Sequence, residues 1–332
     1  MTAVIQTEEL GKRYRTRWAL AGCTLSIPAG HVVGLVGPNG AGKTTLINLA
    51  TGMLAPSAGT IEVLGGRPAA GPAQLARVGY LAQDAPLYAG LPVADHLRLG
   101  AHLNPGWDAE MARYRIDQLG LDPGQKAGKL SGGQRAQLAL TLALGKRPEL
   151  LILDEPVASL DPLARREFLQ GLMETVAEQQ VSVLLSSHLI SDLERVCDYM
   201  IVLVDSRVRV AGPADELLAT HHLLSGPRRD PASLPDGVEV ISASHTDVQT
   251  TLLVRTSGPV LDPAWARNWR QVSQIISAPP GGGCGDRVRR SASCRRAPGL
   301  PGPPRRPSRP GRRPGRRCGP AAWSARRCGW RR

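Results

Sequence analysis

Eight residues near the N-terminus have the types and spacing that bind a phosphate chain. Gly37 to Thr44 read Gly-Pro-Asn-Gly-Ala-Gly-Lys-Thr, which matches the P-loop pattern G-x-x-x-x-G-K-[ST]. The glycines let backbone N–H groups approach phosphate oxygens, the lysine adds a point charge, and the threonine hydroxyl can reach Mg²⁺. A chance glycine-rich turn is the alternative, and an expected strand before the loop and helix after it argue against that. We expect nucleotide contacts from Gly37, Pro38, Asn39, Gly40, Ala41, Gly42, Lys43, Thr44 and Thr45.

Two carboxylates follow an apolar run further along the chain. Leu150–Leu153 is continuously apolar, and Asp154 and Glu155 come directly after it. Ligands of open α/β sheets bind at the carboxyl ends of the strands, where both side chains would emerge. Asp154 would hold Mg²⁺ through water, and Glu155 would polarise or position an attacking water. The alternative is an ordinary strand that ends in a polar turn, and the P-loop upstream favours the catalytic interpretation.

A third motif, Leu130-Ser131-Gly132-Gly133-Gln134, narrows the class of protein. It directly precedes an expected helix, so Ser131 and the glycine amides would form a second phosphate-binding helix start. The motif resembles the signature of ABC ATPases, and the resemblance covers roughly residues 3–222. In that family the signature completes the ATP site of the opposing subunit. The resemblance therefore implies two ATP molecules held between the subunits of a head-to-tail dimer.

Two more residues occur where the resemblance implies them on the nucleotide side. Tyr14 resembles the aromatic residue that stacks on adenine, with Trp18 as the competing candidate and a surface aromatic as the alternative. Gln83 resembles the glutamine that senses Mg²⁺ and the membrane partner, although a lone glutamine is usually solvated. The resemblance thus implies Thr44, Gln83 and Asp154 as the residues around Mg²⁺.

The last family elements lie beyond the apolar strand. Ser159-Leu160-Asp161 resembles the D-loop, and Asp161 before Pro162 is also a good helix N-cap. His188 resembles the switch histidine that contacts the γ-phosphate, with a capping or core histidine as the alternative. His221 and His222 have no acidic or cysteine pattern around them, and we interpret them as solvated.

The elements that must position these residues alternate between strand and helix patterns. Strands are expected at Val4–Gln6, Cys23–Ile27, His31–Val36, Gly59–Val63, Leu150–Leu153, Val181–Ser186, Met200–Val204 and Val208–Ala211. Helices are expected at Lys43–Thr51, Ala94–Leu103, Ala109–Leu119, Gln134–Gly145, Pro162–Gln179 and Asp192–Cys197. The pattern predicts an α/β fold: a P-loop ATPase core with a mostly parallel sheet flanked by helices, an N-terminal antiparallel β part and a helical insert subdomain.

Charge divides the chain unevenly. The net charge of +13 would suggest a nucleic-acid partner, but residues 265–332 contain 18 Arg, no Lys and one acid, which leaves −4 for the rest. The segment is rich in Pro, Gly and Arg and lacks apolar periodicity, so we expect disorder. We hypothesise a frameshift near Trp265, which reading the gene in its other frames would test. A genuine arm for anionic lipid or nucleic acid is the alternative.

Three regions follow from these patterns. We expect an ABC ATPase domain at 1–226 with its insert at about 84–146, a linker and small β appendage at 227–264, and the tail at 265–332. The N-terminus shows no secretory signal, and no apolar run approaches the roughly 20 residues of a membrane-spanning helix.

The resemblance implies an ATPase with ATP and Mg²⁺ as its ligands. Its implied partners are a separate membrane permease and a second ATPase subunit, identical or related, at the cytoplasmic face of the cell membrane. Residues 83–97 resemble the branch that powers exporters of drugs, lipids or polysaccharides; an importer subunit is the alternative. ABC ATPases that act on ribosomes or DNA usually carry two tandem ATP sites or a long coiled-coil insert. This sequence shows neither feature, so we do not expect nucleic acid as a partner. Leu87, Tyr88 and Leu91 are candidates to receive the permease, or to pack under the insert.

Overall fold

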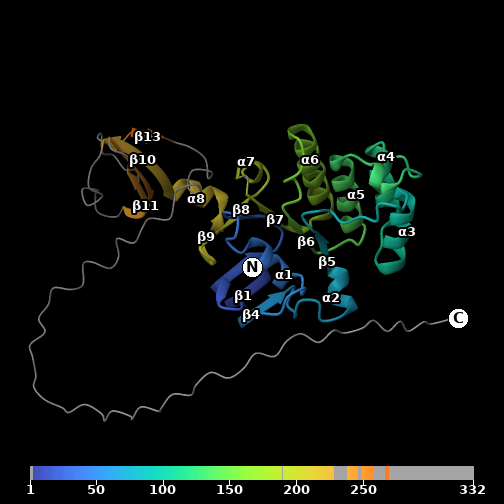
Figure 1. The fold of residues 1–332 in the computed structure, drawn as a ribbon, viewed down its shortest axis with the longest axis horizontal. Helices are drawn as coiled ribbons and strands as arrows, with labels where there is room; N and C mark the ends of the chain where they lie inside the picture. Colours follow the sequence, from blue (N-terminus) through green and yellow to red (C-terminus); the bar gives the residue numbers. More distant parts are fainter. Residues whose placement is uncertain (1–2, 189, 228–237, 246–247, 257–265, 269–332) are drawn as a thin grey trace, which may run out of the picture. The chain divides into compact units, whose positions relative to one another are not determined.

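A computed structural model describes residues 3–188, 190–227, 238–245, 248–256 and 266–268 (Figure 1). The strands are β1 (Ala3–Tyr14), β2 (Arg17–Pro28), β3 (Val32–Val36), β4 (Ala58–Val63), β5 (Val78–Leu81), β6 (Leu150–Asp154), β7 (Ser182–Ser187), β8 (Tyr199–Val204), β9 (Arg207–Pro213), β10 (His221–Pro227), β11 (Glu239–His245), β12 (Gln249–Arg255) and β13 (Ala266–Asn268). The helices are α1 (Lys43–Ala50), α2 (Pro72–Arg77), α3 (Val93–Leu103), α4 (Ala109–Gln118), the short 3-10 helix η1 (Ala127–Lys129), α5 (Gly132–Leu144), α6 (Pro162–Gln179), α7 (Ile190–Leu193) and α8 (Ala214–Thr220).

The central sheet has six strands in the order β5-β6-β7-β3-β8-β9. All neighbours are parallel except β8 and β9, which are antiparallel. Strand β6 shows why its sequence is continuously apolar. Leu151 and Leu153 pack in the core shared with α5 and α6, whereas Leu150 and Ile152 pack in the core shared with α1. Successive side chains of a strand point to opposite faces, so a sheet covered on both faces buries all four.

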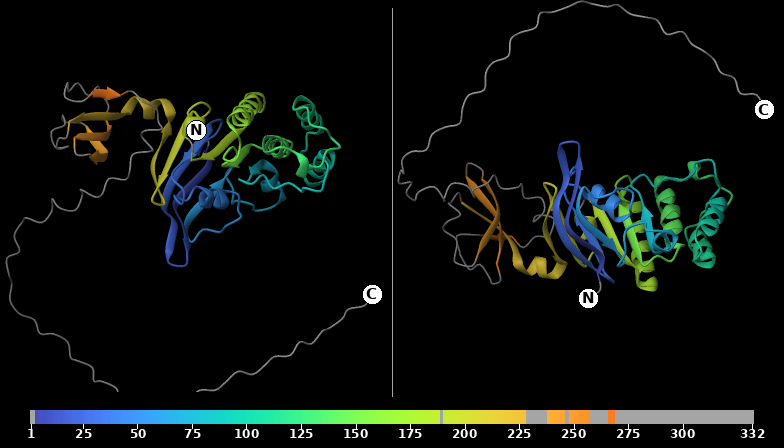
Figure 2. Two further views of the ribbon diagram at one scale, coloured as in Figure 1. Left: turned by 45° about the horizontal axis from the view of Figure 1, so that its top comes forward. Right: turned by 90° about the horizontal axis from the view of Figure 1, so that it is seen from below.

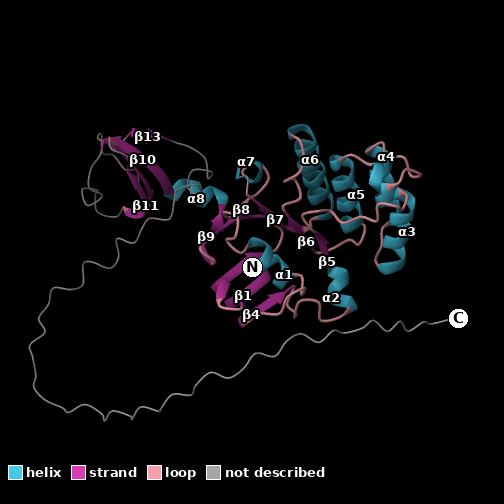
Figure 3. Ribbon diagram, viewed as in Figure 1, coloured by secondary structure: helices cyan, strands magenta, loops and turns pink. Residues whose placement is uncertain are grey.

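A smaller antiparallel sheet, β2-β1-β4, covers the α1 side of the core. Figure 3 shows its strands β1 and β4 next to α1, and buried residues such as Ile5 and Leu10 belong to the same core as the buried residues of α1. Strands β1 and β2 are much longer than predicted. Their outer positions carry polar residues such as Glu8 and Glu9, which hid the strand pattern. The expected P-loop ATPase fold, with a mostly parallel sheet and an N-terminal antiparallel part, is confirmed.

Helices α3, α4 and α5 lie beside one another, as both views in Figure 2 show, and α5 also packs against α6. The three helices begin and end within two residues of their predicted bounds. They share a small core of their own, in which Val93, Ile116 and Leu138 are at most 2% exposed. Helix α5 therefore contributes one face to this insert core and the other to the main core.

Several elements differ from the sequence expectation. Helix α2 and strands β5 and β10 were not predicted, because each is short or begins at polar residues. Helix α7 spans Ile190–Leu193 rather than the predicted Asp192–Cys197, and the exposed Asp198 beyond its end accepts a hydrogen bond from the Val32 amide at 3.0 Å. His221 was predicted to be solvated, and this was wrong: it is 7% exposed, and burial lowers the pKa of its imidazole.

A second antiparallel sheet, β11-β12-β10-β13, is described by itself. Its small core contains Leu224, Leu252 and Val254, each fully buried. Strand β10 lies across the expected boundary at residue 226, and β13 lies within the segment assigned to the tail; the domain boundaries stay predictions. Residues 228–237, in the predicted linker and β appendage, and the Arg-rich residues 269–332 lie outside the described residues. None of the helices in the described parts of the chain has both the length and the apolar character to cross a bilayer.

Candidate nucleotide site

The P-loop is a backbone cradle that only glycine can form at two positions. It joins the end of β3 to Lys43, the first residue of α1, and Gly42 caps that helix with φ 109°. A Cβ on Gly42 would lie 2.4 Å from the Ala19 carbonyl oxygen, and one on Gly37 would lie 2.2 Å from that of Leu203. The glycines thus let neighbouring backbone approach the loop closely, and the amides in the first turn of a helix, which lack partners within the helix, can bind an anion.

The side chain of Lys43 lies against the backbone of its own loop. Its side chain is 5% exposed, and Nζ donates hydrogen bonds to the carbonyl oxygens of Gly37 at 2.8 Å and Pro38 at 3.4 Å. Nζ also lies 3.3 Å from Oε1 of Glu155, whose side chain is 12% exposed. A buried ammonium group requires such partners, because an unpaired charge in the interior is costly. This ion pair joins the P-loop to the end of β6, and the sequence did not predict it.

Asp154 and Glu155 are held by Ser186 on the neighbouring strand. Asp154 is 2% exposed and accepts a hydrogen bond from Ser186 Oγ at 2.7 Å. The Glu155 amide donates to the same Oγ at 2.9 Å, and Glu155 has φ 46°. Sequence reasoning did not identify Ser186 as a residue of this site. Its place beside Asp154 follows from the pairing of β6 with β7, which sets Asp154 opposite Ser186. The Asp154 charge reaches Tyr80 on β5, where burial raises the phenol pKa and Asp154 raises it further.

His188 completes a row of three charged or polar groups. Its Nδ1 lies 2.9 Å from Oε2 of Glu155, so Glu155 has one carboxylate oxygen on Lys43 and the other on His188. The His188 side chain is 38% exposed, whereas Lys43 is buried. The row runs from the P-loop interior toward solvent and holds the carboxylate of Glu155 in a fixed orientation. Such a carboxylate can accept a proton from a water molecule beside a phosphate.

Most of the predicted nucleotide residues line one cavity of about 610 Å³. These are Tyr14, Asn39, Gly40, Gly42, Lys43, Thr44, Thr45, Gln83, Glu155 and His188. Trp18 lines it as well, and Tyr14 and Trp18 are 48% and 40% exposed, so both aromatic rings are open to a base. Arg17 and Ala158 also line the cavity and were not predicted. Gly37, Pro38, Ala41 and Asp154 are not among its lining residues.

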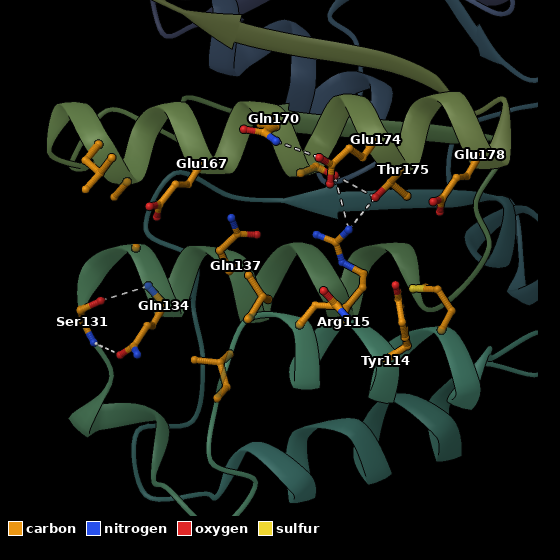
Figure 4. A pocket seen from close by; sticks show the side chains of 18 of the residues that line it. Tyr114, Arg115, Ser131, Gln134, Gln137, Glu167, Gln170, Glu174, Thr175 and Glu178 are labelled. Atoms are coloured by element: carbon orange, nitrogen blue, oxygen red, sulfur yellow. Dashed lines mark hydrogen bonds between the residues drawn. The ribbon is translucent and has the colours of Figure 1, made fainter.

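The signature residues lie at another place on this chain. Ser131 caps α5: its Oγ accepts from the Gln134 amide at 3.2 Å, and Gln134 Oε1 accepts from the Ser131 amide at 3.0 Å (Figure 4). Ser131, Gly133, Gln134 and Asp161 line a second cavity of about 720 Å³ between α4, α5 and α6. Asp161 caps α6 by accepting hydrogen bonds from the amides of Leu163 and Ala164, both at 3.0 Å. The capping interpretation of Asp161 is therefore confirmed.

The donor set around the first cavity fits Mg²⁺, which prefers oxygen ligands. Thr44 and Gln83 are exposed at the cavity and offer a hydroxyl and an amide oxygen. Asp154 is buried, and its Oδ1 accepts a hydrogen bond from Ser186. Asp154 is not a lining residue, so Thr44 and Gln83 are the oxygen donors exposed to an ion in the cavity, and Asp154 would contribute its negative charge to the site.

Comparison with known proteins decides the family. The ABC transporter family profile matches residues 20–158. The thiamine import ATP-binding protein ThiQ of Salmonella choleraesuis is 36% identical over 203 residues, which cover 59% of this chain and 86% of that protein. The chain belongs to the ABC transporter ATP-binding family. It is an ATPase whose hydrolysis is coupled to transport.

Other relatives of this ABC ATPase agree. The thiamine import ATP-binding protein of Escherichia coli is 34% identical over 203 residues, covering 59% of this chain and 87% of that protein. A solved ATP-binding subunit of an ABC transporter has a TM-score of 0.58 and 29% identity, over 64% of this chain and 91% of that one. The cbiO1 subunit of the Clostridium perfringens cbiONQ complex has a TM-score of 0.58 and 27% identity, over 66% and 92%. The expected exporter-like branch is not confirmed, because these sequence relatives are named as import proteins.

Proposed function

We propose that the cavity beside the P-loop is one half of a composite ATP site that hydrolyses ATP to ADP and phosphate. The observation that carries this proposal is the row formed by Lys43, Glu155 and His188 directly over the P-loop. The α1 amides and Lys43 would bind the β- and γ-phosphates, and Tyr14 or Trp18 would stack on the base. Thr44, Gln83 and Asp154 would hold Mg²⁺, which would neutralise phosphate charge when bound.

Lys43 would couple phosphate binding to the activation of Glu155. A γ-phosphate at the loop competes with Glu155 for the Lys43 ammonium group, because both are anions within reach of one Nζ. Once Lys43 turns to the phosphate, the Oε1 atom of Glu155 is free to accept a hydrogen bond from water. The water oxygen then attacks the γ-phosphorus, Glu155 takes the proton, and the bond to the bridging oxygen breaks toward ADP. His188 holds Oε2 of Glu155 and would contact the γ-phosphate.

The other half of the site would come from a second ATPase subunit. Ser131, Gly132, Gly133, Gln134 and Asp161 of that subunit would face the phosphates bound by the first. In support, Ser131, Gly133, Gln134 and Asp161 line a different cavity from Lys43. The start of α5 also presents amides and a hydroxyl at one point, which suits an anion.

Glu155→Gln tests the hydrolytic role directly. The amide cannot accept the water proton, so we expect turnover to fall by about 100-fold or more while ATP binding persists. Since Gln also removes the negative charge that competes for Lys43, ATP-dependent dimers should accumulate in size-exclusion chromatography. Glu62→Gln, on the exposed side of β4, is the matched control and should behave as wild type. Wild-type turnover in Glu155→Gln would remove Glu155 from the proposed role.

A groove next to Gln83 is the proposed permease contact. It has a volume of about 500 Å³ and is lined largely by apolar side chains, among them Leu75, Pro86 and Leu87. Tyr88 and Leu91 follow at 66% and 36% exposed, and the Tyr88 amide donates to His96 Nε2 at 3.1 Å, which ties this loop to α3. A short cytoplasmic helix of the permease would bury these side chains. Cross-linking from a cysteine at Leu87 to a co-purified permease would test the contact.

We infer a peripheral location on the cytoplasmic face of the cell membrane, beside a separate permease. The thiamine import proteins among the relatives support import as the direction of transport. Export is the second candidate, and it rests on residues 83–97, which resemble the exporter branch. Uptake and efflux assays in vesicles that contain the co-purified permease would distinguish the two directions. The substrate would be selected by that permease.

A further inference from the structure

One arginine in the first turn of α6 contacts two segments that the proposed mechanism uses. Arg165 Nη2 donates to the carbonyl oxygen of Leu160 at 3.3 Å, and Nη1 lies 3.3 Å from Oδ2 of Asp192. The side chains of Arg165 and Asp192 are 22% and 14% exposed. Leu160 directly precedes Asp161, and Asp192 belongs to α7, four residues after His188. The guanidinium group therefore joins the start of α6 to the segment that carries the histidine.

The guanidinium group of Arg165 and the carboxylate of Asp192 are largely buried, and each has few other polar partners. Arg165 Nε and Asp192 Oδ2 are buried and have no hydrogen-bond partner among the described residues. The ionic contact is thus what offsets the cost of burying the two groups. Arginine suits the position because its planar, forked donors can reach a carbonyl and a carboxylate together, which the single ammonium group of lysine does less well.

The segment that follows His188 needs such an anchor. Helix α7 is a single turn, Ile190–Leu193, and an isolated turn of helix is not stable by itself. Leu193 fixes one side of this turn, since it is fully buried in the core that also contains Leu160. The described polar contact of His188 is with Glu155, and its ring is partly exposed. Loss of the Arg165–Asp192 pair would therefore leave the His188 segment free to shift.

We infer that Arg165 is a positioning residue for hydrolysis: by holding Asp192, it keeps His188, four residues earlier, in contact with Glu155. This inference rests on the proposed role of His188. Arg165 acts through other groups and lies outside the lining of the P-loop cavity. Its effect should therefore appear in the rate of hydrolysis and leave the binding of ATP nearly unchanged.

Arg165→Ala tests the inference in the full chain. We expect kcat for ATP hydrolysis to fall by about tenfold and KM to change by less than about twofold, because a small displacement of a catalytic group slows the chemical step. Arg166→Ala is the matched control, since Arg166 is the exposed neighbour on the same helix, and it should retain wild-type turnover. Asp192→Asn, which keeps the shape of the side chain, should reproduce the loss, and Arg165→Lys should restore part of it.

A double-mutant cycle with His188→Ala separates positioning from general stability. If Arg165 acts through His188, adding Arg165→Ala to His188→Ala lowers single-turnover hydrolysis no further. A further tenfold loss would overturn the inference, as would wild-type kcat in Arg165→Ala. If Arg165→Ala fails to fold, Asp192→Asn takes its place in the same cycle. Wild-type turnover in His188→Ala would instead reject the proposed role of His188, and this inference with it.

Discussion

Replacing Gly42 by alanine tests the claim that the P-loop backbone, and not only its lysine, makes the site. Gly42 has φ 109°, and its added Cβ would lie 2.4 Å from the Ala19 carbonyl oxygen and 2.8 Å from a Leu20 methyl group. Two costs therefore arise together. One is the conformational cost of positive φ for a residue with a Cβ, and the other is the collision with backbone that cannot rotate away.

Two other glycines separate these costs. Gly30 and Gly40 have φ 78° and 82°, and an added Cβ would meet nothing within 4 Å at either. Alanine at each should cost about 1–2 kcal/mol in the free energy of unfolding, the usual cost of the left-handed region. At Gly42 the collision adds about 1–3 kcal/mol of overpacking, so we expect a total of about 2–5 kcal/mol. The difference between Gly42→Ala and Gly30→Ala measures the collision alone.

Urea unfolding of the three variants, followed by titration with ATP, gives both readouts. Gly30→Ala should bind ATP as wild type does, because Gly30 lies before β3 and outside the cavity. Gly40→Ala should match Gly30→Ala in unfolding and bind ATP more weakly, since Gly40 lines the cavity. If the free energies of unfolding of Gly42→Ala and Gly30→Ala agree within about 0.5 kcal/mol, local movement of the backbone relieves the collision, and the P-loop is less rigid than the close contacts imply.

Two further predictions concern the elements around the site. Phe168→Ala should lower the free energy of unfolding by about 3–5 kcal/mol, since Phe168 is fully buried in the core between α6 and the sheet, whereas Leu163→Ala, 64% exposed on the same helix, should change it by less than about 0.5 kcal/mol in urea titrations. The hydrogen bond from the Met111 amide, with Arg147 assisting, lowers the pKa of Asp108 at the N-terminus of α4. The folded protein thus gains stability from the ionised carboxylate above about pH 4 and loses it below. Asp108→Asn should therefore flatten the dependence of the free energy of unfolding on pH, measured between about pH 3 and 7. Equal pH dependence in the variant and the wild type would contradict this prediction.

The sequence predicted the site best where its signal is local. The P-loop is contiguous, and its strand, loop and helix occur in order, so Lys43 and Thr44 could be placed without knowing the rest. Helix α6 was found with its exact ends because Asp161 and Pro162 mark its start and apolar periodicity continues to Gln179. Four consecutive apolar residues likewise identified β6.

What could not be predicted depends on contacts between strands. Ser186 is one of several serines in an apolar strand, and only the pairing of β6 with β7 places it between Asp154 and the Glu155 amide. His221 was misjudged for a related reason. Its burial follows from its position on β10, and that strand was not predicted because it begins at two polar residues; its pairing with β12, about thirty residues further along the chain, is visible only in the fold.

The contact between Lys43 and Glu155 shows how one arrangement can serve both charge balance and catalysis. A lysine that is 5% exposed requires an anion, and Glu155 is the carboxylate in contact with it among the described residues. In the proposed mechanism, a phosphate that binds the same Nζ would replace Glu155 as the anion, so phosphate binding would also release the carboxylate. The carboxylate would then be free to accept a proton only when its target is in place, because the phosphate that frees it would be the group that water attacks. Replacing Lys43 should therefore impair Glu155 as well as phosphate binding, and the two losses should not be additive.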